Sequence, residues 1–90
     1  MALELDIVAF YIRPSADLLS HFEPFEPDKD GYELAVFDAG LTIEEFLIAR
    51  VVPENLPLLI TLNGNVIEQE DYGTTRILER DYLNLMLHVH

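Results

Sequence analysis

Short apolar runs separated by polar, turn-forming segments are the main feature of this chain, and they predict a sheet of several strands. Residues 3–12 alternate at first and then become continuously apolar, which is typical of a strand that enters from an edge and ends buried. We expect Arg13-Pro14 to break this strand, because proline lacks the donor that a sheet ladder requires. Residues 32–37 are rich in β-forming side chains and run into a turn signal at 38–40, so they predict a second strand paired with the first.

The strongest local signal in the sequence is a helix start at Thr42. The Thr42 hydroxyl can accept from the Glu45 amide while the Glu45 carboxylate reaches back to the Thr42 amide, which is a capping box. The helix is expected to run for about ten residues and to end before Pro53. Its apolar side chains recur at helical spacing and must cover something flat; they are Ile43, Phe46 and Leu47.

The second half of the chain predicts three more strands. Residues 58–62 are nearly all apolar, as expected of a central strand, and Asn63-Gly64 favours a tight hairpin to a short strand at 66–67. Residues 77–78 are expected to form one turn of helix against the core. Residues 82–90 predict a last strand, with two alternating sets of side chains: Leu83, Leu85, Leu87 and Val89 on one face, and Tyr82, Asn84, Met86, His88 and His90 on the other.

The connection between the first two strands, residues 15–31, is the least regular part of the sequence. Ser15 can cap a short helix over 15–22, and the prolines that follow forbid its continuation. Residues 28–31 have the composition of a turn that ends in Gly31. The sequence therefore predicts a long, acidic, proline-bearing connection here.

Composition places this pattern in one small acidic domain spanning residues 1–90. The chain has 17 acidic and five basic residues and a formal net charge of −12. Such a charge repels phosphate backbones and anionic lipid, so we expect no nucleic acid and no membrane among its partners. No apolar run is long enough to span a bilayer, and the first ten residues lack the basic start of a signal peptide, which favours a cytoplasmic location. With no cysteine, the chain has no disulfide or thiolate nucleophile.

The acidic residues are unevenly placed. Residues 1–45 hold 11 acidic and two basic residues, whereas residues 46–90 hold six and three. One interpretation is a solvated acidic face that keeps a small apolar domain soluble. The other is docking on a basic partner protein, and the expected partners are accordingly neutral or basic.

The order of the expected elements is strand, strand, helix, strand, short strand, strand. This order resembles the β-grasp, or ubiquitin-like, α+β fold, and the sequence resembles the small sulfur-carrier proteins of the MoaD and ThiS type. Residues 8–11 look like the first strand of that family, 42–47 like its helix start and 59–64 like its third strand and Asn-Gly turn. Residues 78–83 resemble its entry to the last strand, except that Arg80 replaces the usual glycine. The resemblance implies a mixed sheet with one main helix packed across it.

One departure from the family bears on the activity. These carriers act through a flexible C-terminal tail ending in two glycines, whose carboxylate is adenylated and converted to a thiocarboxylate. Here the sequence ends at His88-Val89-His90, with neither the glycines nor the tail. The resemblance therefore implies the β-grasp fold and binding to a partner protein through one face of the sheet. The alternative is a sulfur-carrier or molybdopterin/thiamine cofactor-synthesis small subunit whose functional tail is absent from this sequence.

No set of residues in the sequence predicts catalysis. His88 and His90 share one face of the expected last strand and could share a metal ion, but no third ligand is identifiable. The adjacent carboxylates Glu44 and Glu45 point apart on a helix, so they do not form an acid–base pair. We expect a non-enzymatic protein with no catalytic residue, no cofactor and no metal.

The aromatic residues indicate a docking surface. Five phenylalanines and four tyrosines are more than one helix can cover on one face of a sheet. We expect the second face to bind a protein partner, or a second copy of the chain, through a set of four residues: Tyr82, Met86, Tyr11 and Phe10. The alternative is that residues 15–31 fold back and cover this face, using Leu18, Leu19, Phe22 and Phe25. The sequence thus predicts a protein-interaction module, and a binding domain detached from a larger metabolic enzyme is a further possibility.

Overall fold

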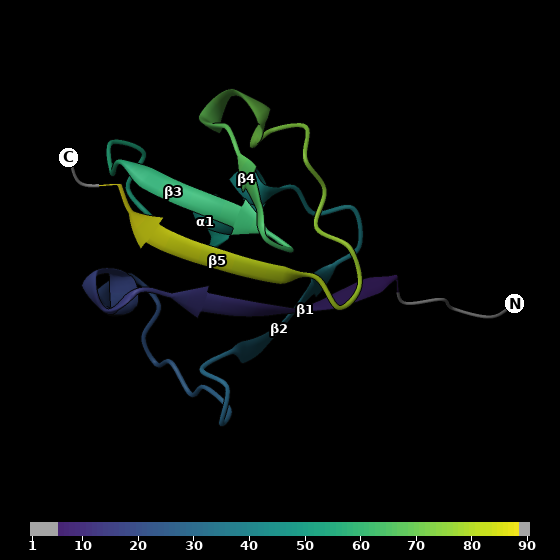
Figure 1. The fold of residues 1–90 in the computed structure, drawn as a ribbon. Coiled ribbons are helices and arrows are strands. Elements are labelled where there is room, and N and C mark those ends of the chain that lie inside the picture. The colour runs from purple at the N-terminus through teal and green to yellow at the C-terminus, as the bar shows by residue number, and fades with distance from the viewer. Residues whose placement is uncertain (1–5, 89–90) are drawn as a thin grey trace, which may run out of the picture.

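The computed structural model describes residues 6–88, which form an α+β fold with a five-stranded mixed sheet and one main helix (Figure 1). The strands are β1 (Ile7–Pro14), β2 (Glu33–Asp38), β3 (Leu58–Leu62), β4 (Asn65–Ile67) and β5 (Tyr82–Leu87). The helix is α1 (Ile43–Ala49), and two short 3-10 helices lie in the connections, η1 (Ala16–His21) and η2 (Gln69–Asp71).

The first and last strands of the described chain are neighbours at the centre of the sheet, whose order is β2-β1-β5-β3-β4. β1 pairs antiparallel with β2 and parallel with β5, and β3 runs antiparallel to both β5 and β4. The predicted pairing of the second strand with the first is confirmed, and so is the position of the last strand beside the first. The Asn63-Gly64 turn is also confirmed, with φ angles of 53° and 86°.

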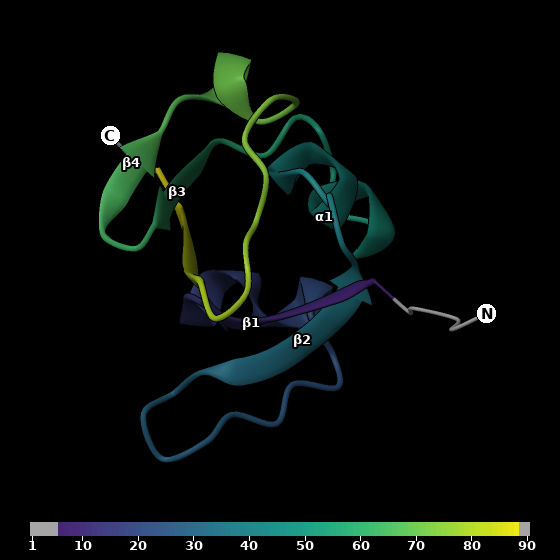
Figure 2. The ribbon, with the colours of Figure 1, turned by 90° about the vertical axis from the view of Figure 1, so that its right-hand side faces the viewer.

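The core lies between the sheet and α1, which covers one of its faces (Figure 2). Phe46 of α1 is fully buried, and its ring centroid lies 5.6 Å from that of Phe10 and 5.5 Å from that of Phe37. The strands contribute the apolar residues of one alternation set, which places them all on this covered face. They include Val8, Ile12, Ile60, Leu83 and Leu85.

The start of α1 is the predicted capping box. The Glu45 amide donates to Thr42 Oγ1 at 3.2 Å, and the Thr42 amide donates to Glu45 Oε1 at 3.1 Å. The first turn of a helix leaves its amides without acceptors inside the helix. The capping box gives two of them, those of Thr42 and Glu45, a side-chain acceptor.

The end of α1 comes earlier than expected, after seven residues. Val51 turns into the left-handed region with φ 56°, and its amide donates to the Ile48 carbonyl at 3.0 Å. The Val52 amide donates to the Leu47 carbonyl, also at 3.0 Å. This pair of hydrogen bonds is a Schellman motif, in which the left-handed position is usually glycine. The sequence gives no signal of this end, because a β-branched residue occupies the glycine position.

The connection between β4 and β5 is tied to the first turn of α1. The Glu44 amide donates to the Tyr72 carbonyl and the Ile43 amide to the Thr75 carbonyl, both at 3.0 Å. The Ile77 amide donates to the Leu41 carbonyl at 2.9 Å. Ile77 packs in the core as expected, but the prediction of a helical turn at 77–78 is wrong. This stretch runs extended beside residues 41–42, and the helical turn is η2 instead.

The apolar residues Leu18, Phe22 and Phe25 of the 15–31 segment pack on the covered side of the sheet, so the alternative in which they cover the open face is wrong. Leu18 and Phe22 are almost completely buried, and the Phe22 ring stacks on Phe46 at 6.2 Å. The short helix expected here is the 3-10 helix η1, and Ser15 precedes it without making the predicted side-chain cap. The Ser15 hydroxyl is buried and has no hydrogen-bond partner among the described residues.

Glu33 connects this segment to the helix. Its Oε2 accepts from the Glu26 amide at 2.7 Å, and its Oε1 lies 3.3 Å from Arg50 Nη2 at the end of α1. The Arg50 guanidinium also lies 5.4 Å from the centre of the Phe22 ring. One half-buried carboxylate therefore holds the 26–33 stretch and α1 together at the first residue of β2.

Two strand boundaries differ from those expected. Pro14 is the last residue of β1 and does not break it, since a proline is tolerated where the ladder ends and no further donor is needed. β5 ends at Leu87, and residues 3–5 and 89–90 of the predicted terminal strands lie outside the described residues.

We predict that Val51→Gly stabilises the protein. A non-glycine residue in the left-handed region costs about 1–2 kcal/mol, and replacing it with glycine removes this cost. The greater conformational freedom of glycine in the unfolded chain offsets only part of the stability gained. The expected rise in the free energy of unfolding is about 1 kcal/mol, measured by urea denaturation. Ala49→Gly, at an exposed helical position in the same element, should instead lower it by about 0.5–1 kcal/mol. A loss of stability in Val51→Gly would contradict the prediction.

We also predict alkaline destabilisation that depends on Tyr72. Burial, together with the nearby Glu68 carboxylate, raises the pKa of the Tyr72 hydroxyl above its ordinary value of 10.0. Above pH 10 the unfolded chain releases this proton more readily than the folded chain, so the free energy of unfolding should fall as the pH rises through the pKa of the folded state. Tyr72→Phe should show a smaller fall in urea denaturation at pH 9 to 12. If the free energy of unfolding of both proteins falls equally between pH 9 and 12, ionisation of Tyr72 does not contribute to the fall.

Candidate docking surface on the open face of the sheet

The open face, defined as the side of the sheet turned away from α1, carries large apolar side chains. Pairing register identifies its members, because residues paired across strands share a face: Tyr11 pairs with both Leu34 and Tyr82, and Leu59 pairs with Met86. Six large apolar residues on these strands are between 39% and 57% exposed: Ile7, Leu34, Val36, Val66, Tyr82 and Met86. Exposed apolar side chains on neighbouring strands are typical of a protein-binding surface.

Three tyrosines form the middle of this face. The rings of Tyr11 and Tyr82 are stacked with their centroids 5.0 Å apart, and Tyr32 meets Tyr82 edge-on, also at 5.0 Å. Tyr11 and Tyr82 come from the two central strands, whereas Tyr32 directly precedes β2. Aromatic pairs in these geometries contribute about 0.5–1.5 kcal/mol beyond the area they bury, so the cluster is a preorganised, rigid patch.

A polar network holds the tyrosine cluster in place. Asn84 Oδ1 accepts from Arg13 Nε at 3.0 Å, and Asn84 Nδ2 donates to the Tyr32 hydroxyl at 3.1 Å. The Arg13 guanidinium lies 4.9 Å from the centre of the Tyr32 ring. Both ends of the Asn84 amide are therefore engaged, which fixes Arg13 and Tyr32 on either side of it.

The backbone around Tyr82 is fixed by its neighbours. The Tyr82 amide donates to Asn63 Oδ1 at 2.9 Å, and Asn63 Nδ2 donates to Asp81 Oδ1 at 2.8 Å. Asp81 Oδ2 accepts from the Leu78 amide, also at 2.8 Å. The turn after β3 and the start of β5 are thus joined, and Tyr82 is presented from a rigid position.

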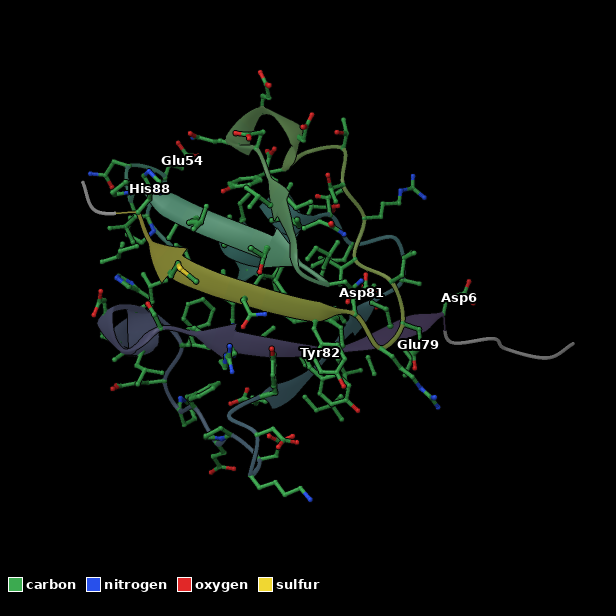
Figure 3. All side chains as sticks on the ribbon, viewed as in Figure 1. Asp6, Glu54, Glu79, Asp81, Tyr82 and His88 are labelled. Atoms are coloured by element: carbon green, nitrogen blue, oxygen red, sulfur yellow. The ribbon has the colours of Figure 1, made fainter. Side chains whose placement is uncertain are left out.

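Acidic side chains gather at one end of this face. Glu79 and Asp81 lie just before β5, Asp6 lies just before β1 on the same side of the molecule (Figure 3), and Asp38 ends β2 opposite Ile7 of β1. Arg80 lies in the same stretch, so the net charge of this end is negative. Such a border favours approach of a positively charged surface.

Three of the four predicted docking residues lie on the open face. Tyr82 and Met86 are exposed there, and Tyr11 is half-buried against Tyr82. The placement of Phe10 on this face is wrong: Phe10 is completely buried beneath α1. Adjacent residues of a strand point to opposite faces, so Tyr11 and Phe10 could not both belong to the surface.

Sequence reasoning missed several members of the face. Leu34 and Val36 alternate with buried Ala35 and half-buried Phe37, and this alternation within 32–37 was the available signal. The roles of Arg13 and Tyr32 had no such signal, because their contacts depend on how the long 15–31 connection returns to the sheet.

The described residues 6–88 contain no group of three or more side chains suited to hold a metal ion. His88 is exposed and lies just after β5, and its expected partner His90 is outside the described part of the chain. Within that part, no helix has both the length and the apolar character needed to cross a membrane. A scan against models of known protein families finds no match. A search of curated protein sequences finds no significant match either.

We predict that Asn84→Ala loosens the tyrosine cluster. The substitution removes the partner of both Arg13 and Tyr32, and a hydrogen bond of this kind contributes about 1 kcal/mol. The free energy of unfolding should fall by about that amount in urea denaturation. Asn65→Ala, at an exposed position of β4, is the matched control and should change it by less than about 0.5 kcal/mol. Equal effects of the two substitutions would show that the network contributes nothing specific.

Proposed function

We propose that this chain is a non-enzymatic protein-interaction module of the β-grasp type, related to the MoaD/ThiS-like carriers, that docks through its open sheet face. The single observation that carries the proposal is the exposed apolar face with the rigid Tyr11–Tyr32–Tyr82 cluster at its middle. Aromatic residues held in a fixed conformation are enriched at the energetic centres of protein interfaces, because little entropy is lost when they bind.

Two features of the chain support the β-grasp assignment. The sheet order β2-β1-β5-β3-β4, with the helix between β2 and β3, is the arrangement that the resemblance implies. Arg80 has φ 67°, a left-handed conformation that favours glycine, and it stands where the carrier family has its glycine. A left-handed backbone at this position supports the assignment, although the side chain differs.

The occupant that we propose is a different protein with a basic border around an apolar centre. The apolar residues of the open face would meet the apolar centre, and the acidic end with Asp6, Asp38 and Asp81 would meet the basic border. A net charge of −12 makes pairing between two copies of this chain electrostatically unfavourable, so a basic partner fits better than self-association.

The test is an affinity measurement on a partner captured from the native host, identified by mass spectrometry and then purified. Leu34→Ser, at a residue 55% exposed on the open face, should weaken binding at least about tenfold in isothermal titration calorimetry. Leu78→Ser is the matched control, since Leu78 is 63% exposed and lies outside the strands. Binding should also weaken as the salt concentration rises.

Three outcomes would overturn the proposal. Equal losses of affinity in Leu34→Ser and Leu78→Ser would show that the partner does not bind at the open face. Binding that salt does not weaken would exclude the basic border. A dimer in sedimentation equilibrium that Leu34→Ser dissociates would assign the face to a second copy of the chain.

The second candidate function is a sulfur-carrier or cofactor-synthesis small subunit, and the conformation of Arg80 favours it for the reason given above. Its test is the intact mass of the protein purified from its own host. A mature terminus of two glycines bearing a thiocarboxylate would establish the carrier, and a mass equal to that of the 90-residue sequence would exclude it.

A further inference from the structure

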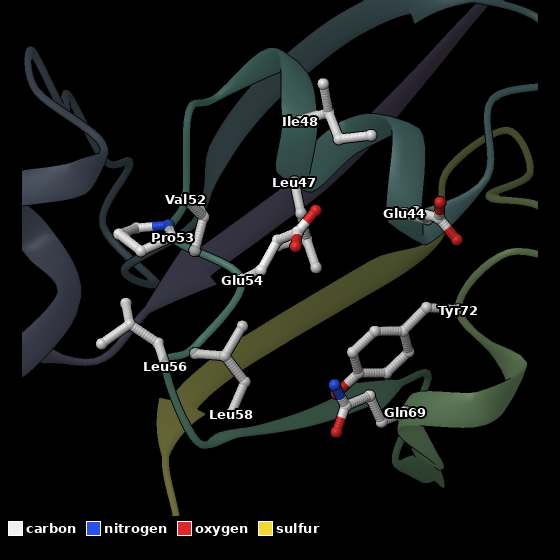
Figure 4. A pocket seen from close by; sticks show the side chains of 10 residues that line it. All are labelled: Glu44, Leu47, Ile48, Val52, Pro53, Glu54, Leu56, Leu58, Gln69 and Tyr72. Carbon is white, nitrogen blue, oxygen red and sulfur yellow. The ribbon is translucent and has the colours of Figure 1, made fainter.

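A pocket on the helix side of the molecule is separate from the open face. It has a volume of about 300 Å³ and lies between α1, the loop after it, the start of β3 and the connection that carries Tyr72 (Figure 4). Its wall includes the apolar residues Leu47, Val52, Leu56 and Leu58 and the ring of Tyr72, and Gln69 lies beside that ring. This volume is at the lower end of the range for ligand sites and suits one large side chain or a small molecule.

Two carboxylates stand at the mouth of the pocket. Glu54 lies next to Leu47 in the view, and Glu44 lies apart from it at the start of α1, on the side of Tyr72 (Figure 4). Both glutamates are exposed, and the ion pair found among residues 6–88 involves neither of them. An apolar hollow between uncompensated negative charges is complementary to an apolar group that has cationic neighbours.

The Glu44 carboxylate lies close to Gly73. A Cβ atom at Gly73 would come within 2.7 Å of Glu44 Oε2, so the carboxylate lies directly over this glycine. The hydrogen bond from the Glu44 amide to the Tyr72 carbonyl joins the same two segments. The backbone of Glu44 is thus joined to the loop that supplies the Tyr72 wall, and its carboxylate lies beside that loop.

The apolar surface continues beyond the pocket mouth. Ile48 lines the pocket and is 62% exposed, and Val51 at the end of α1 is 80% exposed. Val51 also keeps a left-handed backbone that glycine would adopt without strain. Ile48 and Val51 thus continue the apolar surface of the pocket along the end of the helix. Polar residues are usual at such exposed helical positions.

We propose that this pocket binds a basic segment of a partner protein, which inserts one large aliphatic side chain between Leu47 and Tyr72 and places Lys or Arg residues beside Glu44 and Glu54. The site is independent of the open face, because it lies on the opposite side of the sheet. The chain would then have two docking sites, one on the sheet and one on the helix layer.

The test uses NMR titration of the full 90-residue chain with synthetic peptides. The probe is a peptide with one leucine flanked on both sides by lysines. It should shift the amide signals of Leu47, Leu58 and Tyr72 and saturate. A peptide with alanine in place of leucine should bind at least about tenfold more weakly, since it leaves the pocket unfilled. A peptide with glutamates in place of lysines should not bind.

Variants of the chain locate the charges that matter. The double substitution E44Q/E54Q should lower the affinity for the leucine–lysine peptide about fivefold, as expected for two exposed ion pairs. The control E23Q/E26Q makes the same change in net charge in the 15–31 connection and should leave the affinity within about twofold. Leu34→Ser, on the open face, should have no effect, so failure of one docking site is distinguishable from failure of the other.

Several results would overturn the proposal. Shifts confined to open-face residues, or equal losses in E44Q/E54Q and E23Q/E26Q, would mean that the peptide binds elsewhere or through overall charge. Equal binding of isobutanol and the peptide would assign the pocket to small apolar molecules. Concentration-dependent shifts of the pocket signals without peptide would assign it to a second copy of the chain.

Discussion

The parallel pairing of β1 with β5 is the contact on which the rest of the structure depends. It joins segments about 70 residues apart, so nearly the whole chain must close as a loop before this pair can form. The pair divides its side chains between two surfaces. Ile12 and Leu83 face α1 and the core, and Tyr11 and Tyr82 face outward as the stacked centre of the open face. The register of this strand pair therefore decides which residues face the core and which form the docking surface. A shift of one strand by one residue would move its core residues to the open face and its open-face residues to the core.

Signals that depend on a few neighbouring residues were predictable from the sequence. The capping box at Thr42, the strand at 58–62 and the Asn63-Gly64 turn appear where local chemistry demands them. The face of each residue in β1 was harder, because this strand is apolar on both sides over part of its length and alternation gives no contrast there. For this reason the prediction that Phe10 lies on the open face is wrong.

Other features had no local signal. The end of α1 and the bend at Arg80 use left-handed backbone at Val51 and Arg80, which are poor markers for that conformation. The bend at Arg80 is fixed by a long-range hydrogen bond from its amide to the Ala9 carbonyl, and the bend at Val51 by the local hydrogen bond from the Val52 amide to the Leu47 carbonyl. The pocket likewise brings together α1, β3 and the connection after β4, and its shape follows only from their packing.

The contacts of Glu33 with the Glu26 amide and with Arg50 lie at the start of β2, the outer strand on one side of the sheet. β2 is an outer strand, and its unpaired edge could recruit strands from other molecules into a growing sheet. The tether keeps the proline-bearing 23–27 stretch close to the first residue of this edge, where an incoming strand would have to displace it. The carboxylate that fastens the helix therefore also holds residues 23–27 beside one end of the unpaired edge, where they obstruct a strand from another molecule.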